Sequence, residues 1–132
     1  MTSVDRPLVL LVDDNDMILQ RATDALAKSC EIVGTLKDGA SAIKAVDTLR
    51  PDVVVLDVSM RDMSGLEVAT RLRAGGSTVP IVFLTVHDEE EFVRAARAKG
   101  GIGYVVKPRL TSDLLTAVME AHAGRPYVSQ LS

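Results

Sequence analysis

Short apolar runs recur along the chain, and four of them end next to polar residues. The runs cover Leu8–Val12, Val53–Leu56, Ile81–Leu84 and Tyr104–Val106. Continuous runs of this length that are rich in valine and isoleucine are typical of strands buried on both faces, as in a parallel sheet covered by helices. With a further strand expected over Glu31–Leu36, the pattern predicts five strands.

Segments between these runs have the spacing of amphipathic helices, because their apolar residues recur at intervals of three and four. Ser64 and Glu67 form the pattern of a capping box, and Asp38 is a candidate cap for the preceding helix. Thr111 or Ser112 is expected to open the last helix. The apolar faces of four helices comprise Ile18, Leu19, Ala22, Ala25 and Leu26; Ala42, Ile43, Val46 and Leu49; Leu66, Val68, Ala69 and Leu72; and Leu114, Leu115, Val118 and Met119.

The remaining helix is indicated by its charges. Asp88 precedes the acidic run Glu89–Glu91, and Arg94, Arg97 and Lys99 follow toward the other end. This order suits the helix dipole, which favours acidic residues at the amino end and basic residues at the carboxyl end. Five strands that alternate with five helices predict an α/β fold, a doubly wound (βα)5 sandwich around a parallel sheet.

Acidic, hydroxyl and amino side chains stand directly at the ends of the apolar runs. Asp13 and Asp14 follow the first run, Asp57 and Thr85 follow the next two, and Lys107 follows the last. In open parallel sheets the ligand site lies beyond the carboxyl ends of the strands, so these side chains are expected to converge. Carboxylate oxygens are the ligands that Mg²⁺ takes from proteins. The sequence therefore predicts a site for a divalent cation and a phosphoryl group.

Composition and charge narrow the class of protein. The chain has 132 residues, enough for one domain, and its 47% hydrophobic and 25% charged residues are close to globular averages. A net charge of −3 argues against DNA binding by this segment. The first apolar run is too short for a membrane span or a signal peptide, and the single Cys30 cannot form an internal disulfide. We therefore expect a cytoplasmic protein.

Four motifs together resemble the receiver domain of bacterial two-component response regulators. They are Leu11-Val12-Asp13-Asp14, Val55-Leu56-Asp57, Leu84-Thr85 and Lys107-Pro108, and the resemblance runs from Leu8 to about Ala123. It implies a receiver domain over residues 5–124. It also implies a flavodoxin-like (CheY-like) fold with a five-stranded parallel sheet of order 2-1-3-4-5.

The resemblance further implies a role for each site residue. Asp57 would be the phosphoacceptor, taking a phosphoryl group from a phosphohistidine of a sensor histidine kinase to form an acyl phosphate. Lys107 and the Thr85 hydroxyl would bind phosphoryl oxygens. The backbone carbonyl of Ser59 would join the three aspartates as a ligand of Mg²⁺ or Mn²⁺. Such a protein modifies itself and is not a conventional turnover enzyme.

Thr85 and Tyr104 are the switch residues that the resemblance implies. The Thr85 hydroxyl would move toward the phosphoryl group while the Tyr104 ring turns inward. Physically, this requires a two-state element that one new dianion can bias. The surface from Glu89 to Leu115 is where we expect a partner or a second copy of the chain to dock.

Several of these residues also have ordinary structural interpretations. Asp13 or Asp14 could cap the first helix, a common position for aspartate. Lys107 could be a surface lysine, and Tyr104 could be a core residue. His122 is assigned no role.

The loop after Asp57 departs from the commonest pattern of the family. Arg61 stands where a proline often occurs, which predicts either a more mobile loop or a cation near the site. Ser59 and His87 lie two positions after Asp57 and Thr85, where family members control how water reaches the acyl phosphate. Exchange of either residue is expected to alter the rate of dephosphorylation.

The end of the chain suggests what the domain controls. His122–Ser129 resembles the linker that follows receivers of the NarL/FixJ type. Residues 125–132 are therefore expected to begin a linker to a helix-turn-helix DNA-binding domain that controls transcription. The alternative is a single-domain receiver that acts by docking to a partner.

Two other functional classes share part of the pattern. Magnesium-dependent phosphohydrolases of the haloacid-dehalogenase type also use an aspartate nucleophile, but they need a carboxylate two residues later, where this chain has Ser59. A flavodoxin relative that binds nucleotides or flavins needs a glycine-rich loop after the first strand, where this chain has Asp13-Asp14. The residues favour the receiver over both classes.

Overall fold

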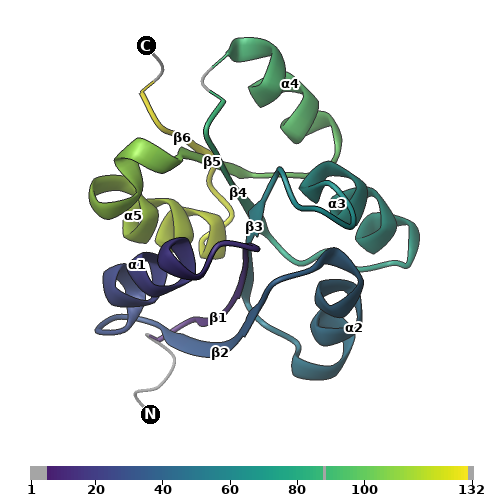
Figure 1. Cartoon of the computed structure of the whole chain (residues 1–132), viewed down its shortest axis with the longest axis horizontal. Helices are drawn as coiled ribbons and strands as arrows, with labels where there is room; N and C mark the ends of the chain where they lie inside the picture. Colours follow the sequence, from purple (N-terminus) through teal and green to yellow (C-terminus); the bar gives the residue numbers. More distant parts are fainter. Residues whose placement is uncertain (1–5, 88, 131–132) are drawn as a thin grey trace.

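A six-stranded parallel sheet with helices on both faces makes up the fold (Figure 1). The computed structural model describes residues 6–87 and 89–130. The strands are β1 (Leu8–Val12), β2 (Glu31–Leu36), β3 (Val53–Asp57), β4 (Ile81–Thr85), β5 (Gly103–Val106) and β6 (Tyr127–Val128). The helices are α1 (Asp16–Leu26), α2 (Gly39–Leu49), α3 (Gly65–Ala74), α4 (Glu90–Ala98) and α5 (Leu110–His122), with a 3-10 turn, η2 (Lys107–Arg109), before the last.

The strands lie in the order β2-β1-β3-β4-β5-β6, which confirms the predicted order 2-1-3-4-5 and adds one strand at its edge. Because β1 lies between β2 and β3, the strand order reverses there and leaves a crevice beyond the carboxyl ends of β1 and β3. The register pairs Asp57 with Leu84 and Thr85 with Val106. Residues that follow β1, β3, β4 and β5 therefore meet at one edge of the sheet.

Alternate residues of the central strands face two separate hydrophobic cores. In β1, Leu10 and Val12 belong to the core under α2, α3 and α4, whereas Val9 and Leu11 belong to the core under α1 and α5. Figure 1 shows the same division, with α1 and α5 on one side of the sheet. Since side chains of a strand alternate between faces, a strand covered on both sides must be apolar throughout. This explains the continuous apolar runs in the sequence.

The two predicted helix caps, Asp38 and Ser64, accept hydrogen bonds from free amides at the starts of α2 and α3. Asp38 accepts from the Ser41 amide at 2.7 Å, and Ser64 accepts from the Glu67 amide at 3.1 Å. The Glu67 carboxylate pairs with Arg71 one turn later. The predicted cap at Ser64 is thus confirmed, whereas the Glu67 side chain pairs with Arg71 in place of completing a capping box.

The starts of α5 and α4 differ from those of α2 and α3. Helix α5 begins at Leu110, before the predicted Thr111 or Ser112, because η2 leads directly into it. Helix α4 begins at Glu90 without a side-chain cap, and Asp88, which the charge pattern placed before it, lies outside the described residues. Within residues 6–87 and 89–130, no helix has both the length and the apolar character needed to cross a membrane.

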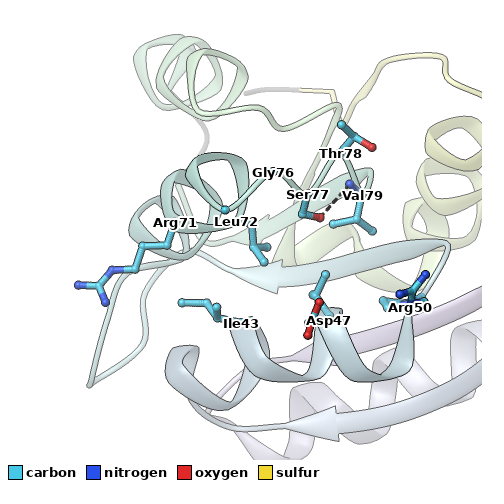
Figure 2. Close-up of a pocket in the computed structure, with 12 residues that line it drawn as sticks. Ile43, Asp47, Arg50, Arg71, Leu72, Gly76, Ser77, Thr78 and Val79 are labelled. Carbon is cyan, nitrogen blue, oxygen red and sulfur yellow. Dashed lines mark hydrogen bonds between the residues drawn. The ribbon is translucent and has the colours of Figure 1, made fainter.

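A hollow of about 590 Å³ lies between α2 and α3 (Figure 2). Val46 and Leu72 contribute apolar lining, and Asp47, Arg50 and Arg71 contribute charged groups. The residues that precede β3 and β4 also line it, so it lies at the amino ends of the strands. It is therefore at the opposite edge of the sheet from the predicted site.

Strand β6 was not predicted, and it holds the end of the described chain against β5. Tyr127 and Val128 pair in parallel with Gly103 and Tyr104. The Ser129 amide continues the pairing by donating to the Tyr104 carbonyl at 2.8 Å. Part of the segment expected to begin a linker therefore packs against this domain.

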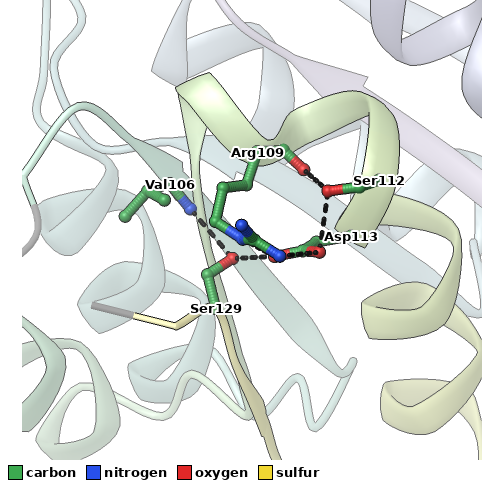
Figure 3. A network of polar contacts seen from close by, with 5 residues as sticks. All are labelled: Val106, Arg109, Ser112, Asp113 and Ser129. Atoms are coloured by element: carbon green, nitrogen blue, oxygen red, sulfur yellow. Dashed lines mark hydrogen bonds and ion pairs between the residues drawn. The ribbon is translucent and has the colours of Figure 1, made fainter. Parts of the chain in front are cut away.

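A buried polar network fixes this segment (Figure 3). The Ser129 hydroxyl donates to Asp113 at 2.8 Å and accepts from the Val106 amide at 3.3 Å. Asp113 also accepts hydrogen bonds from Ser112 at 3.0 Å and from Arg109 at 2.9 Å. The network joins β5, the start of α5 and the residue after β6.

Candidate functional site

Two buried aspartates and a lysine meet at the carboxyl edge of the sheet. Asp13 follows β1 and Asp57 ends β3, and each is 1% exposed. Nζ of Lys107 lies 3.1 Å from Oδ2 of Asp13 and 3.3 Å from Oδ1 of Asp57. One carboxylate oxygen from each of Asp13, Asp14 and Asp57 lies within 4.8 Å of the other two. The structure thus brings together the predicted acidic residues and the predicted lysine.

Asp13 faces this cluster and does not cap α1. Its amide donates to the Leu36 carbonyl at 2.9 Å, which extends the pairing of β1 with β2 by one residue. Its Oδ1 accepts from the Asn15 amide at 2.9 Å, and the Asn15 side chain is the cap, accepting from the Ile18 amide at 3.1 Å. The alternative in which Asp13 or Asp14 caps the first helix is therefore wrong.

The acidic cluster has more negative than positive charge. Burial raises the pKa of Asp57 to about 6, and repulsion from Asp13 adds to this rise, while Lys107 and the Ser59 amide oppose it. Burial would lower the pKa of Lys107, but the carboxylates of Asp57 and Asp13 outweigh burial and raise it. Lys107 therefore stays charged and only partly offsets the three acids.

An unpartnered carboxylate oxygen in the cluster suits a divalent cation. Among the described residues, Oδ2 of Asp57 is buried and accepts no hydrogen bond, whereas the buried Oδ2 of Asp13 has the Lys107 ammonium as its ion-pair partner. Buried polar atoms without a partner are rare in proteins. Hard cations take carboxylate oxygens of this kind as ligands. The cluster of Asp13, Asp14 and Asp57 therefore fits a metal ion.

Helix α3 begins so close to Asp57 that its first position must be glycine. A Cβ atom on Gly65 would collide with the carbonyl oxygen of Asp57. The Gly65 amide donates to the Val58 carbonyl at 2.8 Å, which folds the loop back onto the end of β3. Sequence reasoning missed this residue. The available signal was a glycine directly after the Ser64 cap, because glycine is unfavourable in helices unless close packing requires it.

Thr85, His87 and Tyr104 form a connected group beside the cluster. Thr85 is buried at the end of β4, and its Oγ1 accepts from the His87 amide at 3.1 Å. The Tyr104 hydroxyl donates to the His87 carbonyl at 3.2 Å, and the residue is 3% exposed. The His87 ring stacks on Phe92 of α4 with centroids 4.0 Å apart. The backbone of His87 thus joins the two predicted switch residues, and Tyr104 faces inward.

The loop between β3 and α3 carries Ser59 and Arg61. Ser59 is exposed, and its amide donates to Oδ1 of Asp57 at 3.1 Å. Arg61 is exposed and lines a hollow of about 360 Å³ beside the cluster. The residues lining this hollow are Asp14, Lys37, Asp38, Arg61 and Asp62. The arginine therefore presents a cation near the site, one of the two expectations for this position.

Known proteins share this pattern along most of the chain. The family model of the response regulator receiver domain matches residues 9–119. The chain is 32% identical over 132 residues to the nitrate/nitrite response regulator protein NarL of Escherichia coli (strain K12), covering 98% of this chain and 61% of NarL. It is 43% identical over 100 residues to the probable transcriptional regulatory protein TcrX of Mycobacterium tuberculosis, covering 76% of this chain and 43% of TcrX. The chain spans about half the length of these relatives.

Solved structures have the same fold. The signal receiver domain of the putative response regulator NarL from Mycobacterium tuberculosis matches with a TM-score of 0.86 and 28% identity, covering 92% of this chain and 99% of that one. The response regulator domain of Thermotoga maritima CheB matches in fold alone, with a TM-score of 0.82 and 22% identity, covering 92% and 99% of the two chains. The predicted flavodoxin-like (CheY-like) fold is confirmed.

Proposed function

Because the chain belongs to the response regulator receiver domain family of two-component signalling, we propose that it accepts a phosphoryl group on Asp57. The donor would be a phosphohistidine of a sensor histidine kinase. The observation that carries this assignment is the setting of Asp57. It is buried beside Asp13 and Lys107, and one of its carboxylate oxygens accepts no hydrogen bond from the described residues.

Mg²⁺ or Mn²⁺ would be held by Asp13, Asp14, Asp57 and the backbone carbonyl of Ser59. When bound, the cation supplies positive charge that relieves repulsion among the carboxylates and attracts the phosphoryl oxygens. The donor set supports this assignment, since three carboxylates are within reach of one ion and Oδ2 of Asp57 is buried without a hydrogen-bond partner among the described residues. Phosphorylation should therefore depend on the cation.

The side chains around Asp57 have distinct roles in the transfer. A carboxylate oxygen of Asp57 forms a bond to phosphorus while the phosphorus–nitrogen bond to the kinase histidine breaks, and the histidine nitrogen keeps the electron pair. Lys107 already contacts Asp57 and pairs with a phosphoryl oxygen as a compact positive charge. The Thr85 hydroxyl accepts from the His87 amide, so its own proton is available for another phosphoryl oxygen.

Ser59 and His87 set the lifetime of the acyl phosphate in this proposal. They lie two positions after Asp57 and Thr85, and Ser59 is exposed while His87 is half-buried. From these positions they would influence the approach of the hydrolytic water. The phosphoryl group is gained and lost on the same chain, so the protein is not a conventional turnover enzyme.

Phosphorylation would bias a two-state arrangement of Thr85 and Tyr104. Their link through His87, whose ring stacks on Phe92, provides a route from the site to α4. The surface from Glu89 to Leu115 would then repack and dock a partner or a second copy of the chain. Because β6 pairs with the edge of β5, docking would use the exposed sides of α4 and α5.

Control of transcription would require a DNA-binding domain outside these residues. TcrX and PrrA of Mycobacterium tuberculosis are named transcriptional regulatory proteins, and this chain covers 43% and 50% of their lengths. The net charge of −3 disfavours direct contact with DNA by the present residues. The signal would thus pass from Asp57 to an output domain outside these 132 residues.

The intact mass of the protein after incubation with acetyl phosphate tests this proposal. Wild type should gain one phosphoryl group with Mg²⁺ and none with EDTA, and Asp57→Ala should gain none. Asp47→Ala removes an acid at the opposite edge of the sheet and is the matched control. An equal adduct in Asp57→Ala, or neither adduct nor Mg²⁺-dependent consumption of acetyl phosphate in wild type, would contradict the proposal.

A further inference from the structure

Asp62 ties the tip of the loop between β3 and α3 to the start of α2. Both of its carboxylate oxygens accept from the Gly39 amide at 3.1 Å, and Oδ2 also accepts from the Ala40 amide at 3.3 Å. The first amides of a helix have no partner within the helix. Asp38 satisfies the next of these amides, that of Ser41. Two acids from different parts of the chain therefore share the start of α2.

The start of a helix is a favourable position for an ionised carboxylate. The free amides and the helix dipole place positive charge there, and hydrogen bonds to a charged acceptor are stronger than neutral ones. The hydrogen bond from Gly39 lowers the pKa of Asp62 below its usual value, and the bond from Ala40 adds to this effect. Asp62 is therefore ionised at neutral pH, the state in which the tether is strongest.

Close packing accompanies the tether. A Cβ atom on Gly39 would lie 2.7 Å from Cγ2 of Val68 and 3.2 Å from Cβ of Met63. Met63 belongs to the loop and Val68 to α3, so both lie directly against the start of α2 without room for a side chain between them. The position of the loop tip relative to α2 is thus defined by contact as well as by hydrogen bonds.

The rest of the loop has its hydrogen bonds near its ends. The Ser59 amide donates to Asp57, and the Gly65 amide donates to the Val58 carbonyl. Among the described residues between Ser59 and Ser64, Asp62 makes the hydrogen bonds that reach another element. This tether comes one residue after Arg61. A proline at position 61 would restrict the backbone, and the hydrogen bonds of Asp62 restrict the loop in its place. This argues against the expectation of a more mobile loop.

We propose that Asp62 is a positioning residue that holds this loop so that the Ser59 carbonyl faces the acidic cluster. The inference rests on the proposed function, because it takes Ser59 and the three aspartates to bind Mg²⁺. Asp62 lines the same hollow as Asp14, so the tether is next to the cluster. Without the tether, the loop occupies the Mg²⁺-binding arrangement for a smaller fraction of the time. The apparent Mg²⁺ affinity falls in proportion to that fraction.

Two Asp62 variants and one matched control separate positioning from charge. Asp62→Ala removes the tether, and Asp62→Asn keeps one acceptor oxygen. Asp38→Ala removes an equal charge from the same helix start and the same hollow, but Asp38 lies outside the loop. The measurements are the Mg²⁺ dissociation constant from an NMR titration and the ¹⁵N relaxation of residues 58–64 in EDTA.

Asp62→Ala should raise the Mg²⁺ dissociation constant about three- to tenfold and increase the mobility of the loop amides without metal. For Asp62→Asn, the dissociation constant and the loop mobility should lie between those of Asp62→Ala and wild type. Asp38→Ala should leave the mobility of the loop amides unchanged. Equal weakening by Asp38→Ala and Asp62→Ala, or no effect of Asp62→Ala, would overturn the inference. If wild type binds no Mg²⁺, the proposed function fails, whereas relaxation in EDTA still decides whether Asp62 holds the loop.

Discussion

At Asp57, burial and the nearby Asp13 disfavour the ionised carboxylate, whereas Lys107 favours it. The apolar run Val53–Leu56 leads into the residue and buries it, and the nearby Asp13 adds repulsion. Lys107 offsets only part of the free-energy cost of ionising Asp57, since its ammonium group is shared between Asp13 and Asp57. An acid in this setting destabilises the folded protein when it is ionised, and binding of a cation would relieve that cost.

Asp57→Asn is expected to stabilise the metal-free protein at neutral pH. The pKa of Asp57 rises from 3.8 to about 6 on folding, so the folded protein binds more protons in this range. The resulting stability is present below the unfolded pKa and is lost as the pH rises through about 6. At pH 7 the variant should exceed wild type by about 1 to 3 kcal/mol in its free energy of unfolding.

Urea unfolding in EDTA, at neutral pH and below the unfolded pKa, measures this difference. The two proteins should converge at the lower pH, where the Asp57 carboxyl is neutral in both folded and unfolded chains. A variant that is less stable than wild type at neutral pH would disprove the charge balance described for this residue.

Gly65→Ala should destabilise the protein through a steric contact with the backbone of Asp57. The new methyl group would collide with the Asp57 carbonyl, and forced displacement of this kind typically costs about 1 to 3 kcal/mol. Gly75→Ala, at the other end of α3, is the control because its Cβ would lie 3.4 Å from the nearest backbone oxygen. Equal free energies of unfolding for the two variants would show that the close approach at Gly65 is unimportant.

At the scale of the elements, strand ends were predictable and contacts between distant segments were not. A strand covered on both faces excludes polar residues, so the first polar residue after each apolar run marked the edge of the sheet, as at Asp13 and Asp57. Strand β6 has two residues, too few for a periodic pattern. Its attachment includes a hydrogen bond from Ser129 to Asp113 of α5, a contact between distant segments that no periodic pattern reveals.

Ser129→Ala should release β6 from β5. The change leaves the Val106 amide without this partner and removes one donor from the buried Asp113, a loss of about 1 to 3 kcal/mol in the free energy of unfolding. Amide hydrogen exchange at Tyr127 and Ser129 should become faster. Ser112→Ala is the control, because Ser112 also donates to Asp113 but, among the described residues, its other hydrogen bond is to the Arg109 carbonyl and not to Ser129 or Val106. Unchanged exchange in Ser129→Ala would mean that strand pairing alone holds the segment.

The same network makes the attachment of β6 depend on pH, and the pKa of Asp113 gives the direction. Burial alone would raise the pKa of Asp113, but hydrogen bonds from Arg109, Ser129 and Ser112 outweigh burial and lower it. The stability from this group is therefore present above its usual pKa and is lost as the pH falls through the lowered pKa. The protection of the Ser129 amide, measured as its exchange rate relative to the intrinsic rate at the same pH, should fall in that acidic range.

At the scale of the whole molecule, strand order brings residues from four separate parts of the chain to one site. Periodicity predicted the alternation of strands and helices, but the order 2-1-3-4-5 came from the resemblance to receivers and is confirmed. The convergence of Asp13, Asp57 and Lys107 followed from that order. The hydrogen bond from Tyr104 to the His87 carbonyl and the tether at Asp62 could not be predicted, because both depend on side-chain contacts across the folded chain.

Mg²⁺ should stabilise the folded protein as a whole. A ligand that binds only the folded state, at a hundredfold excess over its dissociation constant, raises the free energy of unfolding by about 2.7 kcal/mol. Urea unfolding in MgCl₂ should show this increase over EDTA, with NaCl of equal ionic strength as the control. Equal unfolding curves in MgCl₂ and NaCl would contradict a metal site at Asp13, Asp14 and Asp57.

The central claim, that Asp57 is the phosphoacceptor, is tested most directly by locating the acyl phosphate. Borohydride reduces an aspartyl phosphate to homoserine, which peptide mass spectrometry assigns to a single position. After incubation with acetyl phosphate and Mg²⁺, homoserine should appear at position 57 and should be absent when EDTA replaces Mg²⁺. Homoserine at position 13 or 14, or a phosphoryl group on a serine or threonine with Asp57 unmodified, would contradict the account.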